Sequence, residues 1–376
     1  MACRGQSVLT VRVMTCSRKQ ASRGDRQGLR ESRIAALVVR RFVVSDHSER
    51  DSSATLVVWA FTIATTLFLP SVRGEEEELQ RFVKARTIKA SAVIVNSVAV
   101  SRDGKRIVSG GRDLLVWDAA TGEQLKALKN RKSVRSIAFS PDGQLIASCG
   151  FNGTVDVWDA NTSQSLCTLD HPGIGSVRSV AFRPDGRKIA SAGLHEVKIR
   201  DVATRNDVFD LKSQASTVSV AFSPDGGLIA TGTGKHLKLW DAERGMELCA
   251  FDTGFPVLSV SFSPDGSKVV SGGVKALKVW DIAGRKEVGT IENRKVILSV
   301  AYSAHGQHIV SGGEDNAVTV RNADTLQTLE VLKGHSDAVQ CVALSADGQR
   351  IVSGGRDGIV IVWKAKNDRP TDSGEH

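Results

Sequence analysis

Residues 133–169 read SVRSIAFSPDGQLIASCGFNGTVDVWDANTSQSLCTL, and this stretch contains four short apolar runs. The runs are VRSIAF, QLIASC, TVDVWD and SQSLCTL, and turn residues bound each of them, which is typical of β-strands. The segment SPDG at 140–143 separates the first two runs. Its Pro presets φ for a type I turn, its Asp can bond the turn backbone, and its Gly accepts a positive φ. The stretch therefore predicts four strands, with a tight turn after the first.

The same turn recurs along the chain. SPDG returns at 223–226 and 263–266, and the variants SRDG, RPDG, SAHG and SADG occupy 101–104, 183–186, 303–306 and 345–348. The third residues of the seven turns are 39, 43, 40, 40, 40 and 42 residues apart. A period of about 40–45 residues with four strands per unit is that of a propeller blade. The sequence therefore predicts an all-β fold, a seven-bladed β-propeller of four-stranded antiparallel blades, with no helix in the repeats.

The pair Trp-Asp ends the third strand of several units. It lies at 117–118, 158–159, 240–241 and 280–281, and it is replaced by Arg-Asp at 200–201, Arg-Asn at 321–322 and Trp-Lys at 363–364. With the seven turns, these pairs make Val83–Lys364 resemble the WD-repeat family. The resemblance implies a propeller. It also favours a non-catalytic scaffold that binds protein or peptide partners through its loops, although propellers host many unrelated functions.

The resemblance further implies a hydrogen-bonded set inside each blade: a His before the first strand, a hydroxyl on the second, an Asp in the next turn, and the Trp. Only the last unit is expected to hold the complete set, which is His335, Ser353, Asp357 and Trp363. The other units are expected to lack the His. Three of these side chains look like a catalytic triad, but we expect them to hold one blade together.

The last unit ends without a fourth strand, because the sequence after Trp363 is polar and contains Pro370. The segment VKARTIK, at 83–89, lies one repeat before the outer strand of the first unit. We therefore expect 83–89 to supply the outer strand of the last blade, which joins the two ends of the chain and hides an edge strand.

The first 82 residues suggest targeting. Residues 1–53 are basic, lack the repeat, and are interpreted as disordered or processed. Residues 54–74 contain the uncharged run Ala54–Leu69 and are interpreted as a signal or membrane-anchor segment, followed by an acidic linker at 75–82; a polar tail occupies 365–376. Cleavage after Gly74 predicts a secreted or periplasmic protein, and retention predicts anchoring in a membrane through Ala54–Leu69. The alternative is a cytoplasmic protein whose apolar run is not a working signal.

Charge and motifs argue against several function classes. Residues 1–74 hold 12 Lys and Arg and 5 Asp and Glu, so +7 of the +9 net charge lies there and only +2 belongs to the remainder. A nucleic-acid-binding domain needs a basic stripe on the domain itself, so no nucleic acid is expected. The six Cys form no CxxC pair and have no His at metal-ligand spacing. We therefore expect no metal, no cofactor and no catalytic set, in a monomeric propeller.

One rim of the ring is a candidate partner-binding surface. The loops before each first strand and between the second and third strands are expected to share this rim. Its cations are Arg112, Arg131, Lys132, Lys235, Lys275, Arg294, Lys295 and Arg356. An acidic protein partner would fit them, although acidic residues lie in the same loops. The alternative function is an enzyme or a ligand-binding propeller that uses the central channel. The inner strands, which read SIAFS or SVAFS and similar, offer it only small residues and hydroxyls.

Overall fold

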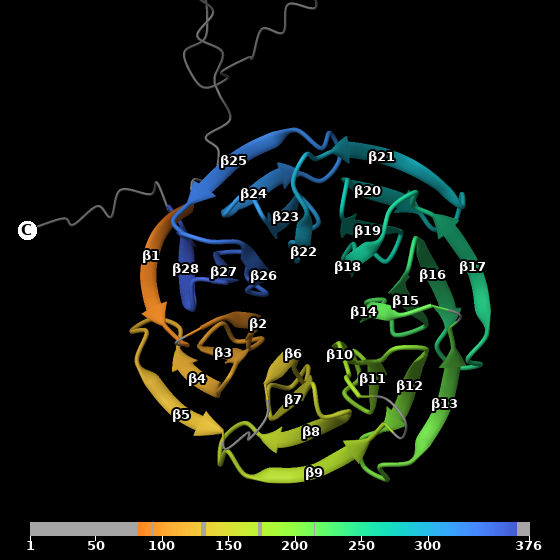
Figure 1. The fold of residues 1–376 in the computed structure, drawn as a ribbon, viewed down its shortest axis with the longest axis horizontal. Coiled ribbons are helices and arrows are strands. Elements are labelled where there is room, and N and C mark those ends of the chain that lie inside the picture. The colour runs from red at the N-terminus through yellow and green to blue at the C-terminus, as the bar shows by residue number, and fades with distance from the viewer. Residues whose placement is uncertain (1–81, 92, 129–132, 172–174, 214, 367–376) are drawn as a thin grey trace, which may run out of the picture. The chain divides into compact units, whose positions relative to one another are not determined.

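The computed structural model describes residues 82–91, 93–128, 133–171, 175–213 and 215–366. These residues form 28 strands and no helix, and the strands make seven four-stranded antiparallel sheets around a central axis (Figure 1). The predicted seven-bladed β-propeller is therefore confirmed.

Within each blade the chain starts at the innermost strand and proceeds outward. The innermost strands are β2 (Val95–Val100), β6 (Val134–Phe139), β10 (Ser179–Phe182), β14 (Thr217–Phe222), β18 (Val257–Phe262), β22 (Ile297–Tyr302) and β26 (Val339–Leu344). The second strands are β3 (Arg106–Gly111), β7 (Leu145–Gly150), β11 (Lys188–Ala192), β15 (Leu228–Thr233), β19 (Lys268–Gly273), β23 (His308–Gly313) and β27 (Arg350–Gly355). The third strands are β4 (Leu114–Asp118), β8 (Thr154–Asp159), β12 (Glu196–Asp201), β16 (His236–Asp241), β20 (Ala276–Asp281), β24 (Ala317–Asn322) and β28 (Ile359–Ala365).

The outer strands complete the blades, which we number from β2 onward. They are β5 (Gln124–Leu128), β9 (Ser165–Asp170), β13 (Asp207–Lys212), β17 (Glu247–Asp252), β21 (Lys286–Glu292), β25 (Thr328–Lys333) and, for blade seven, β1 (Phe82–Lys89). Strand β1 pairs antiparallel with β28, from Phe82 opposite Ala365 to Lys89 opposite Ile359. The closure predicted for 83–89 is thus confirmed. The strand begins one residue earlier than predicted, at Phe82, and β28 continues to Ala365.

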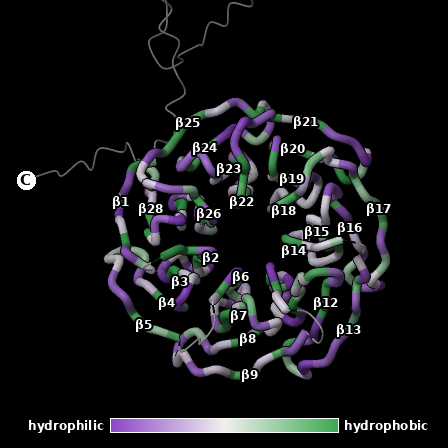
Figure 2. The backbone as a smooth tube through the Cα atoms, viewed as in Figure 1, coloured by the Kyte–Doolittle hydropathy of each residue, from purple (hydrophilic) through white to green (hydrophobic). Residues whose placement is uncertain are grey.

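The core lies between neighbouring blades. The second strands are buried along nearly their whole length because a blade covers each of their faces. In one cluster, Val108 and Val116 of blade one pack with Ile137, Ile146 and Trp158 of blade two. Figure 2 shows hydrophobic residues concentrated in the inner strands and mostly hydrophilic residues along the outer ring.

The SPDG turns join first to second strands, as predicted. In blade two, the Ser140 hydroxyl donates to Asp142, and the same carboxylate accepts the backbone N–H of Gln144 at 3.0 Å. Gly143 has a φ of 71°, which a residue with a Cβ rarely adopts. These bonds hold the pKa of the Asp142 carboxyl below its usual value, the Ser140 bond being the main cause.

Candidate functional site

Six cations of the predicted rim lie in the described loops, and we call them the basic rim: Arg112, Lys235, Lys275, Arg294, Lys295 and Arg356. All six are exposed. They lie in the turns between second and third strands and in the connection from β21 to β22. Arg131 and Lys132, which were also predicted for this rim, lie outside the described residues.

No cation of the basic rim pairs with a carboxylate in the described part of the chain. Two cations at the opposite ends of the strands do pair: Lys188 lies 3.1 Å from Glu243, and Lys268 lies 3.2 Å from Asp324. Exposed acidic residues share the rim loops: Asp113, Asp170, Asp252, Glu292, Glu314 and Asp337. The rim is therefore a mixed surface on which the cations remain available.

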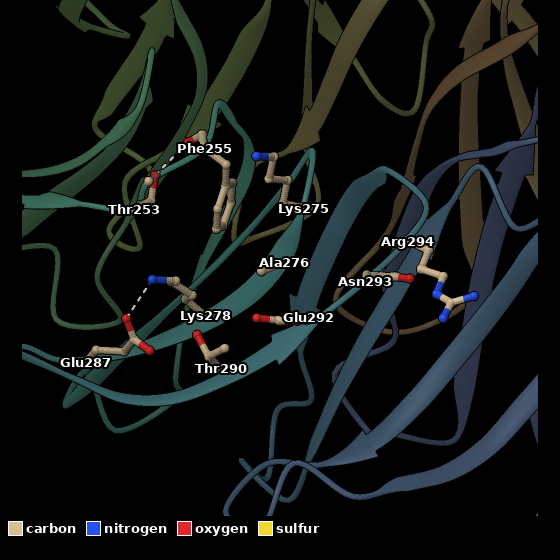
Figure 3. Close-up of a pocket in the computed structure, with 11 residues that line it drawn as sticks. Thr253, Phe255, Lys275, Ala276, Lys278, Glu287, Thr290, Glu292, Asn293 and Arg294 are labelled. Carbon is tan, nitrogen blue, oxygen red and sulfur yellow. Dashed lines mark hydrogen bonds and ion pairs between the residues drawn. The ribbon is translucent and has the colours of Figure 1, made fainter.

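An open pocket of about 620 Å³ on blade five has two rim cations in its lining, and their side chains point in different directions (Figure 3). Lys275 and Arg294 line it, with Phe255 and Glu292 nearby. Deeper on the outer strands, the Lys278 ammonium pairs with Glu287 at 2.7 Å. Lys295 directly follows Arg294, and the remaining three rim cations lie in loops of other blades.

Blade seven contains the predicted set of four side chains in one hydrogen-bond chain. The imidazole Nδ1 of His335 lies 3.0 Å from an oxygen of Asp357, and its Nε2 lies 2.8 Å from the hydroxyl of Ser353. The indole Nε1–H of Trp363 donates to the same hydroxyl at 2.9 Å. Because a carboxylate only accepts, Nδ1–H must donate to Asp357 and Nε2 must accept from Ser353.

Burial controls the chemistry of this set. It lowers the pKa of His335, and the opposing effect of Asp357 is smaller. The imidazole is therefore neutral at pH 7. Ser353 is completely buried, so a substrate has no access to its hydroxyl. A nucleophile must be reachable by its substrate, and this geometry does not provide that access.

The prediction that only the last unit holds such a His is wrong. In blade three, His171 is buried, and its Nε2 lies 2.5 Å from the hydroxyl of Ser191. It lies in the sequence DHPG, before the first strand of that blade, which is the place His335 takes in blade seven. Its Nδ1 has no hydrogen-bond partner in the described structure, and Glu196 is 3.9 Å away.

The third-strand residue in the Trp position reaches the second-strand hydroxyl in most blades. The four further Trp indoles donate at 2.8 to 3.0 Å, in the pairs Trp117–Ser109, Trp158–Ser148, Trp240–Thr231 and Trp280–Ser271. In blade six Arg321 replaces the Trp and donates to Ser311 at 2.8 Å. In blade three Arg200 turns away to Asp207 at 2.5 Å, and His171 bonds the hydroxyl instead.

The innermost strands carry two arginines that the sequence reasoning missed. Arg135 lies in β6, and Arg178 immediately precedes β10. The expectation that the channel offers only small residues and hydroxyls rests on inner-strand segments that begin one residue after each arginine. The repeated triplet SVR, at 133–135 and 176–178, was the signal that would have found them.

Two features of the described residues bear on other site types. No group of three or more His, Cys, Asp or Glu side chains there is arranged to hold a metal ion. Within the same residues, no helix has the length and apolar character needed to cross a bilayer. The apolar run Ala54–Leu69 lies outside the described residues.

Comparison with known proteins gives local similarities to three relatives. The chain is 35% identical over 78 residues to "Cilia- and flagella-associated protein 52" of Chlamydomonas reinhardtii, which is 20% of this chain and 13% of that protein. It is 33% identical over 75 residues to "Small ribosomal subunit protein RACK1" of Medicago sativa and to "Small ribosomal subunit protein RACK1z" of Arabidopsis thaliana, in each case 19% of this chain and 23% of the relative. The alignments thus span less than a quarter of each relative's length.

The family comparison covers most of the chain. Seven segments match the family described as "WD domain, G-beta repeat": 82–118, 122–159, 163–201, 206–241, 247–281, 285–322 and 326–364. Each segment begins with the outer strand of one blade and continues through three strands of the next. The first segment therefore joins blade seven to blade one, as the closure by β1 requires. The chain belongs to the WD domain, G-beta repeat family.

Proposed function

We propose that this protein is a non-catalytic scaffold that binds a protein or peptide partner through the basic rim. The observation that carries this proposal is the number of free charges on one rim. Six exposed cations there have no carboxylate partner in the described structure, whereas Lys188 and Lys268 at the opposite strand ends are paired. Unpaired charge on a rigid ring attracts an acidic partner and speeds encounter.

Reversal of rim charges tests this proposal. The variant combines Arg112→Glu, Lys275→Glu and Arg356→Glu, which lie on three different blades. A matched control reverses three exposed cations of first-to-second turns, Arg102→Glu, Lys105→Glu and Arg187→Glu. Proteins captured from the native source by the full chain are quantified for all three proteins. We expect the rim variant to lose partners that the control retains, and equal retention by both variants contradicts the proposal.

We also propose that the network of His335, Ser353, Asp357 and Trp363 is structural. Its buried hydroxyl and neutral imidazole support this role. The network connects the start of the last blade to its second and third strands, so its loss should affect stability before any binding activity. We further propose a monomeric propeller, which light scattering of the purified chain would test.

For location, we propose the cytoplasmic alternative over a secreted or membrane-anchored protein. Two relatives are named as small ribosomal subunit proteins. In addition, the four described cysteines are all free thiols, which suits a reducing compartment. Fractionation of the native source followed by intact-mass measurement tests this. A chain that begins at Glu75, or one retained in the membrane fraction, contradicts it.

A further inference from the structure

Two adjacent blades begin with the same triplet, Ser-Val-Arg. In blade two, Val134 pairs with Gly150 and Ser136 pairs with Cys149, so Arg135 is a bulge residue with no partner across the sheet. A bulge re-aims its side chain and is frequent beside binding sites. Arg178 has the equivalent place in blade three, just before β10. Strands β6 and β10 are neighbours on the innermost ring (Figure 1).

A backbone bond joins the start of blade three to the turn of blade two that carries an exposed ring. The N–H of Val177, beside Arg178, donates to the carbonyl of Gly150 at 2.9 Å. The next residue, Phe151, is 53% exposed, and the guanidinium of Arg135 lies 4.0 Å from its ring centroid. Phe151 therefore lies at the junction of blades two and three, with Arg135 of blade two over its ring and the 177–178 segment of blade three bonded to the neighbouring Gly150.

The polar atoms around this junction lack partners. The Nε atoms of Arg135 and Arg178 and the hydroxyl of Ser176 are buried and form no hydrogen bond in the described structure. No carboxylate pairs with either guanidinium among the described residues. Burial, and then the charge of Arg178, lower the pKa of Arg135. Buried polar groups are normally satisfied, so these three donors are free to bond an acceptor that enters the junction.

The fold does not require arginine at this place. The equivalent bulge residues Val218, Leu258 and Leu298 are apolar, and Gln340 of blade seven is polar but uncharged, with a buried Nε2 that also lacks a partner in the described structure. Asn96, the equivalent in blade one, satisfies its amide by donating to the carbonyl of Val134 at 2.7 Å. The charge of Arg178 acts on Arg135, and this repulsion opposes folding, whereas the contact with Phe151 favours the charge of Arg135 alone. A ligand therefore gives these two arginines a role that stability does not.

We propose that Arg135, Arg178 and Ser176 form an oxyanion-binding site at the junction of blades two and three, and that it receives a phosphate monoester or a carboxylate side chain of a protein partner. Two guanidinium groups match the oxygens of such an anion in charge and geometry. The exposed face of Phe151 is placed to contact the apolar part of the incoming residue. The protein nature of the partner rests on the proposed function, whereas anion binding itself does not.

The test observes the two unpaired nitrogens directly. Arginine Nε–H signals of the full ¹⁵N-labelled chain are recorded by NMR during titration with N-acetyl-phosphoserine amide and, separately, with N-acetyl-glutamate amide. Arg135→Gln and Arg178→Gln assign the two signals. The control variant Lys126→Gln/Lys286→Gln removes two exposed charges from the outer strands and leaves the site unchanged.

We expect both Nε–H signals to shift with one saturable curve. Either single Gln variant should weaken binding at least about tenfold, because charge-assisted hydrogen bonds are lost, while the control binds like the original chain. Removal of one of two repelling charges should also leave the thermal midpoint of Arg178→Gln unchanged or higher. Tighter binding of the phosphoserine probe identifies a phosphorylated partner, and tighter binding of the glutamate probe an acidic one.

Three results overturn the inference: no shift at either signal, equal shifts at all arginines, or a lower thermal midpoint for both Gln variants with unchanged anion binding. The result of the anion titration is independent of the partner-capture experiment on the basic rim. Anion binding with unaffected capture by the rim variant contradicts only the proposed rim. Lost capture by the rim variant without anion binding contradicts only the oxyanion site.

Discussion

Substitution His335→Ala should destabilise the propeller by about 2–3 kcal/mol. The change removes the donor to Asp357 at 3.0 Å and the acceptor for the Ser353 hydroxyl at 2.8 Å. A buried group left without its partner costs about 1–3 kcal/mol. Part of this cost is relieved, because Asp357 keeps the backbone donors of Ser336 at 2.9 Å and Ile359 at 3.1 Å. The cavity left by the buried imidazole increases the destabilisation again.

Urea unfolding followed by circular dichroism measures this difference, which corresponds to a thermal midpoint lower by roughly 3–5 °C. His195→Ala is the matched control, because His195 is exposed and its side chain makes no described bond. We expect this control to change stability by less than about 0.5 kcal/mol. In a double-mutant cycle, Asp357→Ala should cost less in the His335→Ala background than in the original chain. Equal urea midpoints for the original chain and His335→Ala would refute the reasoning.

Three further predictions follow from the same structure. Deletion of 82–89 removes β1 and exposes the edge of β28, so the truncated chain should lose cooperative unfolding in a thermal melt; a normal melt would show that closure does not depend on β1. Burial lowers the pKa of His171 to about 3, so the unfolded chain, with a pKa near 6.5, binds more protons between these values. The contribution of neutral His171 to the free energy of unfolding should be fully present above about pH 6.5 and should decline toward pH 3. In urea titrations at successive pH values, His171→Gln should therefore show a weaker dependence of this free energy on pH. Burial also raises the pKa of the Cys341 thiol to about 12, so a thiol reagent at pH 8 should label Cys341 only after unfolding, and rapid labelling of the folded chain would contradict its burial.

The sequence predicted the elements that depend on local chemistry. The turn at Ser140–Gly143 needs only its own four residues, and its recurrence counts the blades. The role of β1 was also predictable, because the periodic order of strands leaves one blade incomplete at the end of the chain. These inferences require only the period of the repeat and the residues of the turn, and both can be recognised in the sequence alone.

Contacts between blades were less predictable. His171 was missed because it lies in the longest repeat, 43 residues between Asp142 and Asp185, where the added loop shifts it from the expected spacing. The pairing of Lys268 with Asp324 joins residues 56 positions apart. The sequence cannot show which cation faces which acid until blades are placed side by side. The effect of the Arg178 charge on Arg135 has the same origin, because the two residues belong to different blades.

The proposal that the basic rim binds a protein partner is tested most directly by cross-linking in the native source. An amine-reactive cross-linker is applied, the chain is purified, and partner-linked lysines are identified by mass spectrometry. The rim offers Lys235, Lys275 and Lys295, and the opposite strand ends offer Lys105, Lys188 and Lys268. We predict that links to a partner concentrate on the three rim lysines, and that those to Lys235 and Lys295 disappear in the charge-reversed rim variant, which lacks Lys275. Links confined to Lys105, Lys188 and Lys268 would contradict the proposed binding surface.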